Sequence, residues 1–160
     1  MNKKHLFICT ILWGLAAGSP AGAITSRVGS AEDLGVGVAL GQPIGVTGKY
    51  WLSSTTAVDA VAGYHFNSNF DMHADYLWHS FSSFDVQNGR LPFYFGLGGR
   101  VNLGNDSDFG FRLPIGVSFL PSSQPYEFFA EVAPVVVVAP GIGIDIDGLV
   151  GVRVYLNYLK

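Results

Sequence analysis

The chain has 160 residues, of which only 13% are charged and 49% are hydrophobic, and its formal net charge is −3. Ordinary soluble domains carry roughly 25% charged residues, so this composition is unusual for a protein surrounded by water. The sequence has no basic patch, which argues against nucleic acid as a partner. It also has no uninterrupted run of about 18 apolar residues, the length that a membrane-spanning helix requires.

The N-terminus has the pattern of a secretory signal peptide. Lys3 and Lys4 make the first residues positively charged, residues 6–15 are almost entirely apolar, and an Ala-Gly-Ala cleavage pattern follows at residues 21–23. The apolar run is too short to cross a bilayer and stay there as an anchor. We therefore expect residues 1–23 to be a signal peptide for the general secretory pathway, and residues 24–33 to form a periplasmic lead.

From residue 34 onward, apolar and polar side chains alternate with the period of two that is typical of β-strands. Turn-forming Gly, Pro, Asn, Asp and Ser residues separate eight such segments, each near the ~10 residues that a tilted strand needs to cross a bilayer. The segments are 34–41, 46–52, 58–66, 70–79, 91–100, 109–119, 127–132 and 150–158. The sequence therefore predicts an all-β fold in which residues 34–160 form a closed, antiparallel, eight-stranded transmembrane β-barrel.

The character of the polar face indicates which side of the barrel is inside. A soluble barrel needs many Lys and Glu residues outside, whereas this face is mainly Gly, Ser and Tyr with a few charges of both signs. We expect these charges to fill the lumen as a network of Lys49, Asp59, Asp71, Asp75, Arg100, Arg112, Glu127, Glu131 and Arg153. Glu131 should lie beside Arg112 or Arg153, because all three point inward from neighbouring strands. On the outer face we expect aromatic girdles of Tyr50, Phe66, Phe70, Trp78, Phe109, Phe119 and Tyr158.

Two prolines fall inside expected strands, where each removes a ladder hydrogen bond. Pro114 and Pro134 lie on neighbouring strands, so they form either a pair of bulges or a local gap in the wall that admits an acyl chain. Further along, residues 145–148 (Asp-Ile-Asp-Gly) begin like a calcium loop but lack the rest of that motif. We interpret them as a hairpin turn.

The weak catalytic candidates are His73, His79, Asp75 and Ser80, whose types suit a base, an acid that orients it and a nucleophile. The alternative, which we favour, is that they belong to the lumen network. A metal site of Asp71, His73 and Asp75 is disfavoured, because alternate residues of one strand spread over about 13 Å. We expect no metal and no cofactor.

The last strand is expected to end in the run Val152-x-Val154-x-Leu156-x-Tyr158. With its charged lumen, the chain after the signal peptide resembles the small eight-stranded outer-membrane barrels of the OmpA transmembrane-domain and OmpX type. The resemblance implies a monomer among outer-membrane lipids, inserted by the barrel assembly machinery with the help of periplasmic chaperones. We favour a structural or interaction role. The alternatives are a lipid-modifying enzyme of the lipid A deacylase or acyltransferase kind, and a narrow channel.

Overall fold

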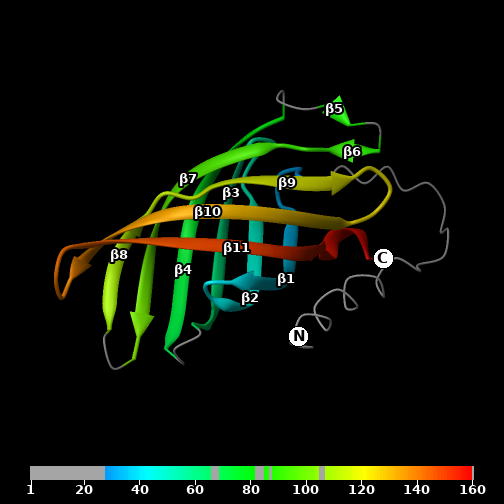
Figure 1. The fold of residues 1–160 in the computed structure, drawn as a ribbon. Coiled ribbons are helices and arrows are strands. Elements are labelled where there is room, and N and C mark those ends of the chain that lie inside the picture. The colour runs from blue at the N-terminus through cyan, green and yellow to red at the C-terminus, as the bar shows by residue number, and fades with distance from the viewer. Residues whose placement is uncertain (1–27, 66–68, 82–84, 87, 105–106, 160) are drawn as a thin grey trace, which may run out of the picture.

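The computed structural model describes residues 28–65, 69–81, 85–86, 88–104 and 107–159 (Figure 1). The expected signal peptide (1–23) and Phe66 lie outside these residues. The strands are β1 (Leu34–Gly41), β2 (Ile44–Trp51), β3 (Thr56–Tyr64), β4 (Phe70–Ser80), β5 (Asp85–Val86), β6 (Gly89–Arg90), β7 (Phe93–Leu103), β8 (Asp108–Arg112), β9 (Ile115–Pro121), β10 (Tyr126–Ala139) and β11 (Gly143–Tyr155). A short 3-10 helix, η1 (Leu156–Tyr158), follows β11.

The main strands form an antiparallel hydrogen-bonded ring. β1 pairs with β2 on one side and with β11 on the other, so the first and last long strands meet. β8 and β9 are two parts of one strand, since both pair with β7 on one side and with β10 on the other. Counted in this way, eight strands follow one another around the ring in chain order. The expected all-β antiparallel fold with eight strands in a ring is confirmed.

The ring has two different ends. One end, which we call the terminal end, carries the start of β1, the end of β11 and the connections 52–55 and 122–125. The other, the hairpin end, carries the connections β1–β2, β3–β4, β7–β8 and β10–β11. The β10–β11 hairpin is the longest and extends past its neighbours (Figure 1).

The expected ends of the last two strands are wrong. β10 continues through Pro134 to Ala139, and β11 begins at Gly143. Pro134 fits because its carbonyl accepts a hydrogen bond from the Leu113 amide at 3.0 Å, and the valines that follow it favour extended backbone. Residues 145–148 are therefore part of β11, and their interpretation as a hairpin turn is wrong.

The connection between β4 and β7 contains two short strands that extend the sheet. β5 and β6 form a two-residue hairpin there, and β6 extends the sheet by pairing with the end of β9. Arg90 of β6 is placed opposite Leu120, and its guanidinium donates a hydrogen bond to the carbonyl of Val28. The hairpin thus links the N-terminal segment to the wall of the ring.

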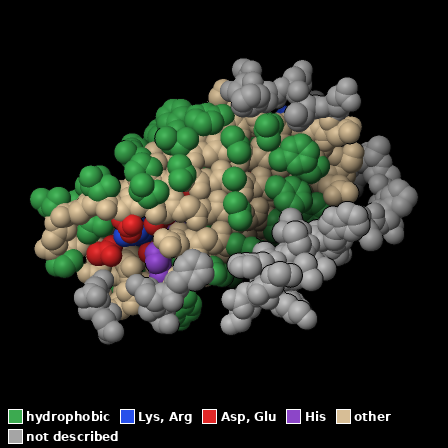
Figure 2. Space-filling view, in the orientation of Figure 1, with side chains coloured by type: hydrophobic (Ala, Val, Ile, Leu, Met, Phe, Trp, Pro, Cys, Tyr) green, Lys and Arg blue, Asp and Glu red, His purple; other side chains and the backbone are tan. Residues whose placement is uncertain are grey.

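The two faces of the ring have opposite chemical character. Outward-pointing side chains are apolar and exposed, for example Val38 (50% exposed), Leu97 (55%) and Phe111 (58%). Figure 2 shows green apolar side chains spread over the visible surface of the strands. The inward positions of the same strands hold charged residues such as Lys49 and Glu127, both fully buried. The ring is therefore inverted relative to a water-soluble β-protein, which buries its apolar face.

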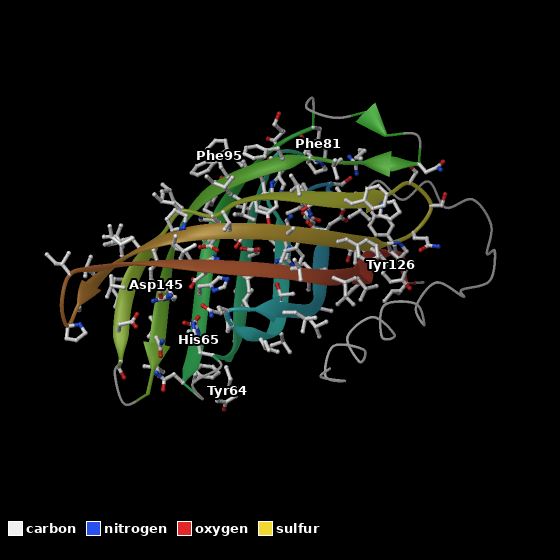
Figure 3. All side chains as sticks on the ribbon, viewed as in Figure 1. Tyr64, His65, Phe81, Phe95, Tyr126 and Asp145 are labelled. Carbon is white, nitrogen blue, oxygen red and sulfur yellow. The ribbon has the colours of Figure 1, made fainter. Side chains whose placement is uncertain are left out.

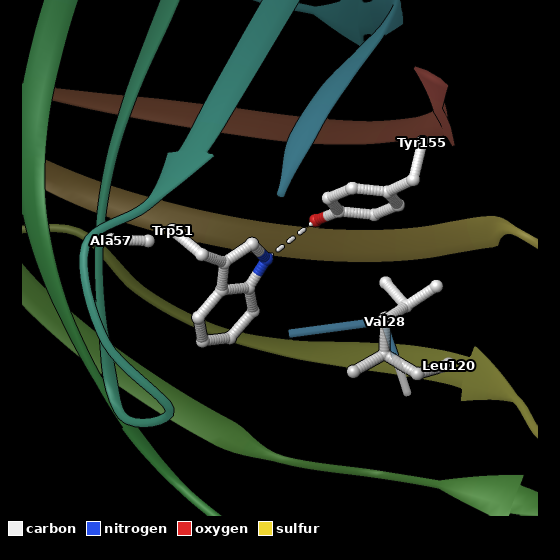
Figure 4. Close-up of a cluster of buried hydrophobic side chains, with 5 residues drawn as sticks. All are labelled: Val28, Trp51, Ala57, Leu120 and Tyr155. Carbon is white, nitrogen blue, oxygen red and sulfur yellow. Dashed lines mark hydrogen bonds between the residues drawn. The ribbon is translucent and has the colours of Figure 1, made fainter. Parts of the chain in front are cut away.

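An apolar cluster fills the ring at its terminal end (Figure 4). Its members are Val28, Trp51, Ala57, Leu120 and Tyr155, with Phe81 and Tyr158 packed against them. Trp51 Nε1 donates to Tyr155 Oη at 2.8 Å, so the two largest rings are joined by a hydrogen bond as well as by contact. We call this set the terminal plug.

The segment before β1 holds the terminal plug in place. The Asp33 carboxylate accepts hydrogen bonds from the amides of Gly29 (3.0 Å) and Ser30 (2.9 Å), and from Tyr158 Oη (3.1 Å). The pKa of the Tyr158 hydroxyl is raised, mainly by burial and secondly by the negative charge of Asp33. Tyr158 lies in η1 because the alternating strand stops at Tyr155, three residues earlier than the sequence suggests.

Glycines inside the ring make room for particular neighbours. A Cβ atom at Gly98 would lie 1.8 Å from Oδ1 of Asp75, its partner across the β4–β7 pair. At Gly116 a Cβ atom would lie 2.4 Å from the ring of Tyr94. Small residues therefore let large or charged side chains fill the ring.

Candidate functional site: the charge network inside the ring

The inside of the ring is filled by charged side chains that pair with one another (Figure 3). The structure places all nine residues of the expected lumen network there, each at most 7% exposed: Lys49, Asp59, Asp71, Asp75, Arg100, Arg112, Glu127, Glu131 and Arg153. They form several connected groups that run from the terminal plug to the hairpin end.

The first group surrounds Glu127 next to the terminal plug. Its Oε1 accepts hydrogen bonds from Lys49 Nζ and Ser118 Oγ, both at 2.6 Å. Its Oε2 accepts one from Tyr155 Oη at 2.6 Å and lies 3.5 Å from Arg153 Nη1. Three hydrogen bonds and one ion pair on this carboxylate compensate for the loss of its hydration.

Arg153 forms the second group. Its Nη2 donates to Asp59 Oδ2 at 2.7 Å, and its Nε and Nη2 donate to Thr47 Oγ1 at 3.0 and 2.8 Å. The guanidinium carbon also lies 4.0 Å from the ring centre of Phe129. Hydrogen bonds along the edges and an aromatic ring against the face fix this side chain in one orientation.

Arg112 forms the third group and contacts acids on three other strands. Its Nη2 donates to Glu131 Oε1 at 2.7 Å, its Nη1 to Asp75, and its Nε to Asp147 Oδ2 at 3.3 Å. These acids come from β10, β4 and β11, while Arg112 ends β8. One guanidinium therefore connects four strands across the interior of the ring.

Of the two partners expected for Glu131, the structure shows Arg112. Arg153 is placed opposite Glu127, four residues before Glu131 on β10, and so belongs to another level of the ring. The second oxygen of Glu131 accepts a hydrogen bond from Tyr94 Oη at 2.9 Å.

Arg100 forms the fourth group, at the hairpin end. Its Nη1 donates to Asp145 Oδ2 and Asp147 Oδ1, both at 2.8 Å, and its Nη2 to Asp108 Oδ1 at 3.2 Å. Its Nε lies 3.8 Å from Asp71 Oδ2, outside hydrogen-bond range. Four acids thus surround one arginine here.

The weak catalytic candidates do not come together as a nucleophile and its base. His79 Nε2 lies 2.9 Å from Lys49 Nζ, and His73 is six residues away along β4, a distance of about 20 Å. Ser80 is exposed on the outer face, whereas both histidines and Asp75 point inward. Ser118, a further serine inside the ring, donates to Glu127. In the part of the chain that the structure describes, these contacts are those of a charge network.

The wall of the ring remains hydrogen-bonded on both sides of Pro114. The Gly96 amide of β7 donates to the Pro114 carbonyl at 2.8 Å, and the Leu113 amide donates to the Pro134 carbonyl of β10 at 3.0 Å. The register with β7 and with β10 is the same before and after Pro114, so no extra residue, and hence no β-bulge, separates β8 from β9. The interruption falls at Pro114, which has no amide N–H to donate.

The outer aromatic residues differ in exposure. Tyr50, Trp78 and Phe109 are 38%, 36% and 39% exposed, while Phe70 and Phe119 are half-buried. The Trp78 ring stacks on Phe95 of β7 with centroids 5.6 Å apart.

Several members of the network are missing from the expected set: Thr47, Tyr94, Ser118, Asp145, Asp147 and Tyr155. The neutral ones all occupy inward positions of the alternation, so the period of two could have identified them. The two acids were missed for a different reason, because they lie in the segment interpreted as a turn.

Comparison with protein-family models, with curated proteins and with solved structures found no match. In the described ranges, no helix is long and apolar enough to cross a membrane.

Proposed function

We propose that this protein is an integral outer-membrane protein whose ring of strands is a closed, eight-stranded transmembrane β-barrel of the OmpA transmembrane-domain and OmpX type. Its role is structural or one of interaction, and its lumen is a salt-bridged interior instead of an open pore. The sequence supports export through residues 1–23, and the aromatic residues of the outer face are the proposed interfacial girdles.

The observation that carries the proposal is the inverted arrangement of the faces. Burying Lys49, Arg112 and Glu127 while exposing Val38, Leu97 and Phe111 would be unfavourable in water. In a bilayer the same arrangement is favourable, because lipid covers the apolar face and the charges satisfy one another inside. A ring also pairs the backbone groups that an open sheet edge would expose to lipid.

The strand lengths agree with this environment. β3, β4 and β7 contain 9, 11 and 11 residues, close to the ~9–11 residues of a tilted membrane-crossing strand. Outer-membrane lipids are then the main partners, the barrel assembly machinery and periplasmic chaperones act during biogenesis, and the finished protein is a monomer.

The proposal is tested by expressing the full chain in a Gram-negative host and separating the cell compartments. We expect the protein in the outer-membrane fraction, extractable with detergent but not with alkaline carbonate, and beginning at Ile24 by N-terminal sequencing. Recovery as a soluble periplasmic protein without detergent would contradict it. A cytoplasmic protein that retains residues 1–23 would contradict it as well.

A further inference from the structure

The β10–β11 hairpin carries the most exposed apolar side chains of the described residues. Ile142 and Ile144 are 92% and 83% exposed and Ile146 is 64% exposed, while no other large apolar side chain exceeds 64%. All three lie beyond Leu149, the last residue of β11 that β1 pairs with, on the hairpin that extends past its neighbours (Figure 1). So much exposed apolar surface on one hairpin indicates an interaction site.

The same segment has a free backbone edge. Residues 143–147 of β11 pair with β10, but β1 does not reach them. The Gly148 carbonyl accepts a hydrogen bond from the Gln42 amide at 3.0 Å, so Ile144 and Ile146, at alternate positions along the strand, direct their backbone groups to this same side. The Ile146 amide meets Oδ1 of Asp145 at 2.9 Å, a local side-chain bond in the place of a strand partner.

Neither water nor lipid suits both features of this segment. Water is unfavourable for the exposed isoleucines, whereas hydrocarbon is unfavourable for backbone N–H and C=O groups that have no strand partner. A further β-strand satisfies both, because it pairs the free edge and packs its own side chains against the isoleucines.

The free edge determines the size and the pattern of a partner strand. Its five residues, 143–147, span about 17 Å, so the interface is small and the association is weak and reversible. Partner side chains opposite Ile144 and Ile146 lie on the same outer face as these isoleucines, so apolar residues fit there. The partner residue between them lies opposite Asp145, on the other face of the sheet.

The charge of the hairpin end favours a basic residue opposite Asp145. The Asp145 side chain is 47% exposed, and residues 134–149 contain two acids and no Lys or Arg. Arg100 bonds Asp108, Asp145 and Asp147 at once, so acids outnumber bases at this end (Figure 3). Charges of opposite sign on neighbouring strands attract, and the field of the excess acids attracts a cationic segment from solution.

A second copy of the chain is a poorer partner for this edge. Its own residues 143–147 carry the same two acids, Asp145 and Asp147, and no base. Pairing two copies would therefore add negative charge to an end that is already negative. A different strand that carries Lys or Arg neutralises this charge instead.

We infer that the free edge of β11, residues 143–147, binds an extended segment of a partner protein in which apolar residues alternate with Lys or Arg. The segment continues the sheet from β11, with apolar side chains beside Ile144 and Ile146 and a basic side chain opposite Asp145. This edge gives the proposed interaction role a location and a partner chemistry. Its assignment rests on the proposed function, in which lipid covers the wall of the ring.

The test measures peptide binding to the full chain in phosphatidylcholine nanodiscs by fluorescence anisotropy, with empty nanodiscs as background. The probe is a labelled peptide about eight residues long, slightly longer than the free edge, in which Val alternates with Lys. The control peptide has the same composition, with all Val residues before all Lys residues. We expect saturable binding of the alternating peptide, at least about fivefold tighter than that of the control peptide.

Two variants test the backbone edge and the charge separately. Ile144→Pro removes a donor of the free edge but no bond to β10, and proline is accepted at such edge positions. It should weaken binding at least about fivefold, while the matched Ile144→Leu, which keeps the amide, should bind like the wild type. Asp145→Asn should weaken binding of the Val–Lys peptide but not that of a Val–Gln peptide, because only the former is charged.

Equal binding of the alternating and control peptides, or equal binding by the wild type and Ile144→Pro, would overturn the assignment of this edge. No saturable binding at millimolar peptide would overturn it as well. Should Ile144→Pro not fold, the comparison of the two peptides on the wild type decides. Two chains per nanodisc that Ile144→Pro reduces to one would show that a second copy occupies the edge, again contrary to the assignment.

The nanodisc experiment also separates this edge from the proposed function. A chain that inserts into nanodiscs and binds no peptide contradicts the binding edge alone and leaves the outer-membrane proposal intact. A chain that stays in solution and does not insert contradicts the outer-membrane proposal, and the assignment of the edge fails with it.

Discussion

Each arginine inside the ring is bonded to acids from more than one strand. Arg112 contacts Asp75, Glu131 and Asp147, while Arg153 contacts Asp59 and Glu127. In a low-dielectric interior, the attraction within such groups offsets the cost of removing the charges from water. The loss of one member leaves its partner charged and buried, which is more harmful than the loss of both.

A double-mutant cycle at Arg112 and Glu131 tests this pairing. Arg112→Gln and Glu131→Gln should each lower the free energy of unfolding by about 3–5 kcal/mol, because each leaves a buried charge without its partner. The double variant should be more stable than the sum of the two effects indicates, with a coupling of roughly 0.5–3 kcal/mol. Urea unfolding of the protein in lipid vesicles measures all three.

The control cycle pairs Glu131 with Arg153, the other partner that the sequence allowed. These residues belong to different levels of the ring, so their effects should add within about 0.5 kcal/mol. Equal coupling in both cycles would mean that the interior rearranges freely, contrary to the fixed contacts described above.

At the residue scale, the sequence predicts well whether a side chain points into the ring or out of it. It predicts poorly which other side chain it contacts. The period of two correctly places Lys49, Glu127 and Arg153 inside, since the alternation in a strand is a local property. Which charges meet depends on the stagger of strands around the ring. For that reason the sequence left two possible partners for Glu131.

At the scale of elements, the ring wall and the β10–β11 hairpin offer different surroundings to similar side chains. Ile115 begins β9 in the middle of the wall and is 44% exposed on the outer face. Ile142 lies in the β10–β11 connection, beyond the last residue that β1 pairs with, and is 92% exposed. In the proposed membrane orientation only Ile115 faces the hydrocarbon core.

Replacing each isoleucine with lysine therefore distinguishes the two environments. Ile115→Lys should destabilise the vesicle-embedded protein by roughly 2–4 kcal/mol, whereas Ile142→Lys should change its stability by at most about 1 kcal/mol. Urea unfolding in vesicles provides both values. A tolerated Ile115→Lys, together with a protein that needs no detergent, would mean that water surrounds the outer face and that the ring is a soluble β-protein.

The element boundaries were predictable where turn residues are dense and not elsewhere. β1, β3 and β4 begin and end within about two residues of the expected segments, since strong turn signals flank them. β10 and β11 were predicted too short because Pro134 and residues 145–148 carry turn-like composition inside strands. Neighbouring strands supplied the hydrogen bonds that overruled these local preferences.

For the whole molecule, two independent barriers lie along the axis of the ring. The terminal plug fills one end with apolar side chains, and the levels of ion pairs around Glu127, Arg153 and Arg112 fill the interior beyond it. An interior filled by side chains is what the size of an eight-stranded ring allows. The sequence indicated the charged levels but not the plug, because Val28 and Trp51 meet only when the N-terminal segment folds across the end.

The two barriers contribute differently: we expect the plug to contribute mainly to stability and the ion pairs to keep the interior closed to ions. A variant of the plug separates these two contributions. Trp51→Ala removes the largest side chain of the plug and its bond to Tyr155, so it should lower the free energy of unfolding by about 3–5 kcal/mol. It should nevertheless leave planar lipid bilayers without stepwise ion conductance, as wild type does, because Lys49, Glu127 and Arg153 remain paired across the interior. Single-channel recording with each purified protein measures this directly.

Regular conductance steps from the wild type would show that the interior is open to ions, and the proposal of a filled lumen would then fail. Steps from Trp51→Ala alone would show instead that the plug, and not the ion pairs, closes the ring.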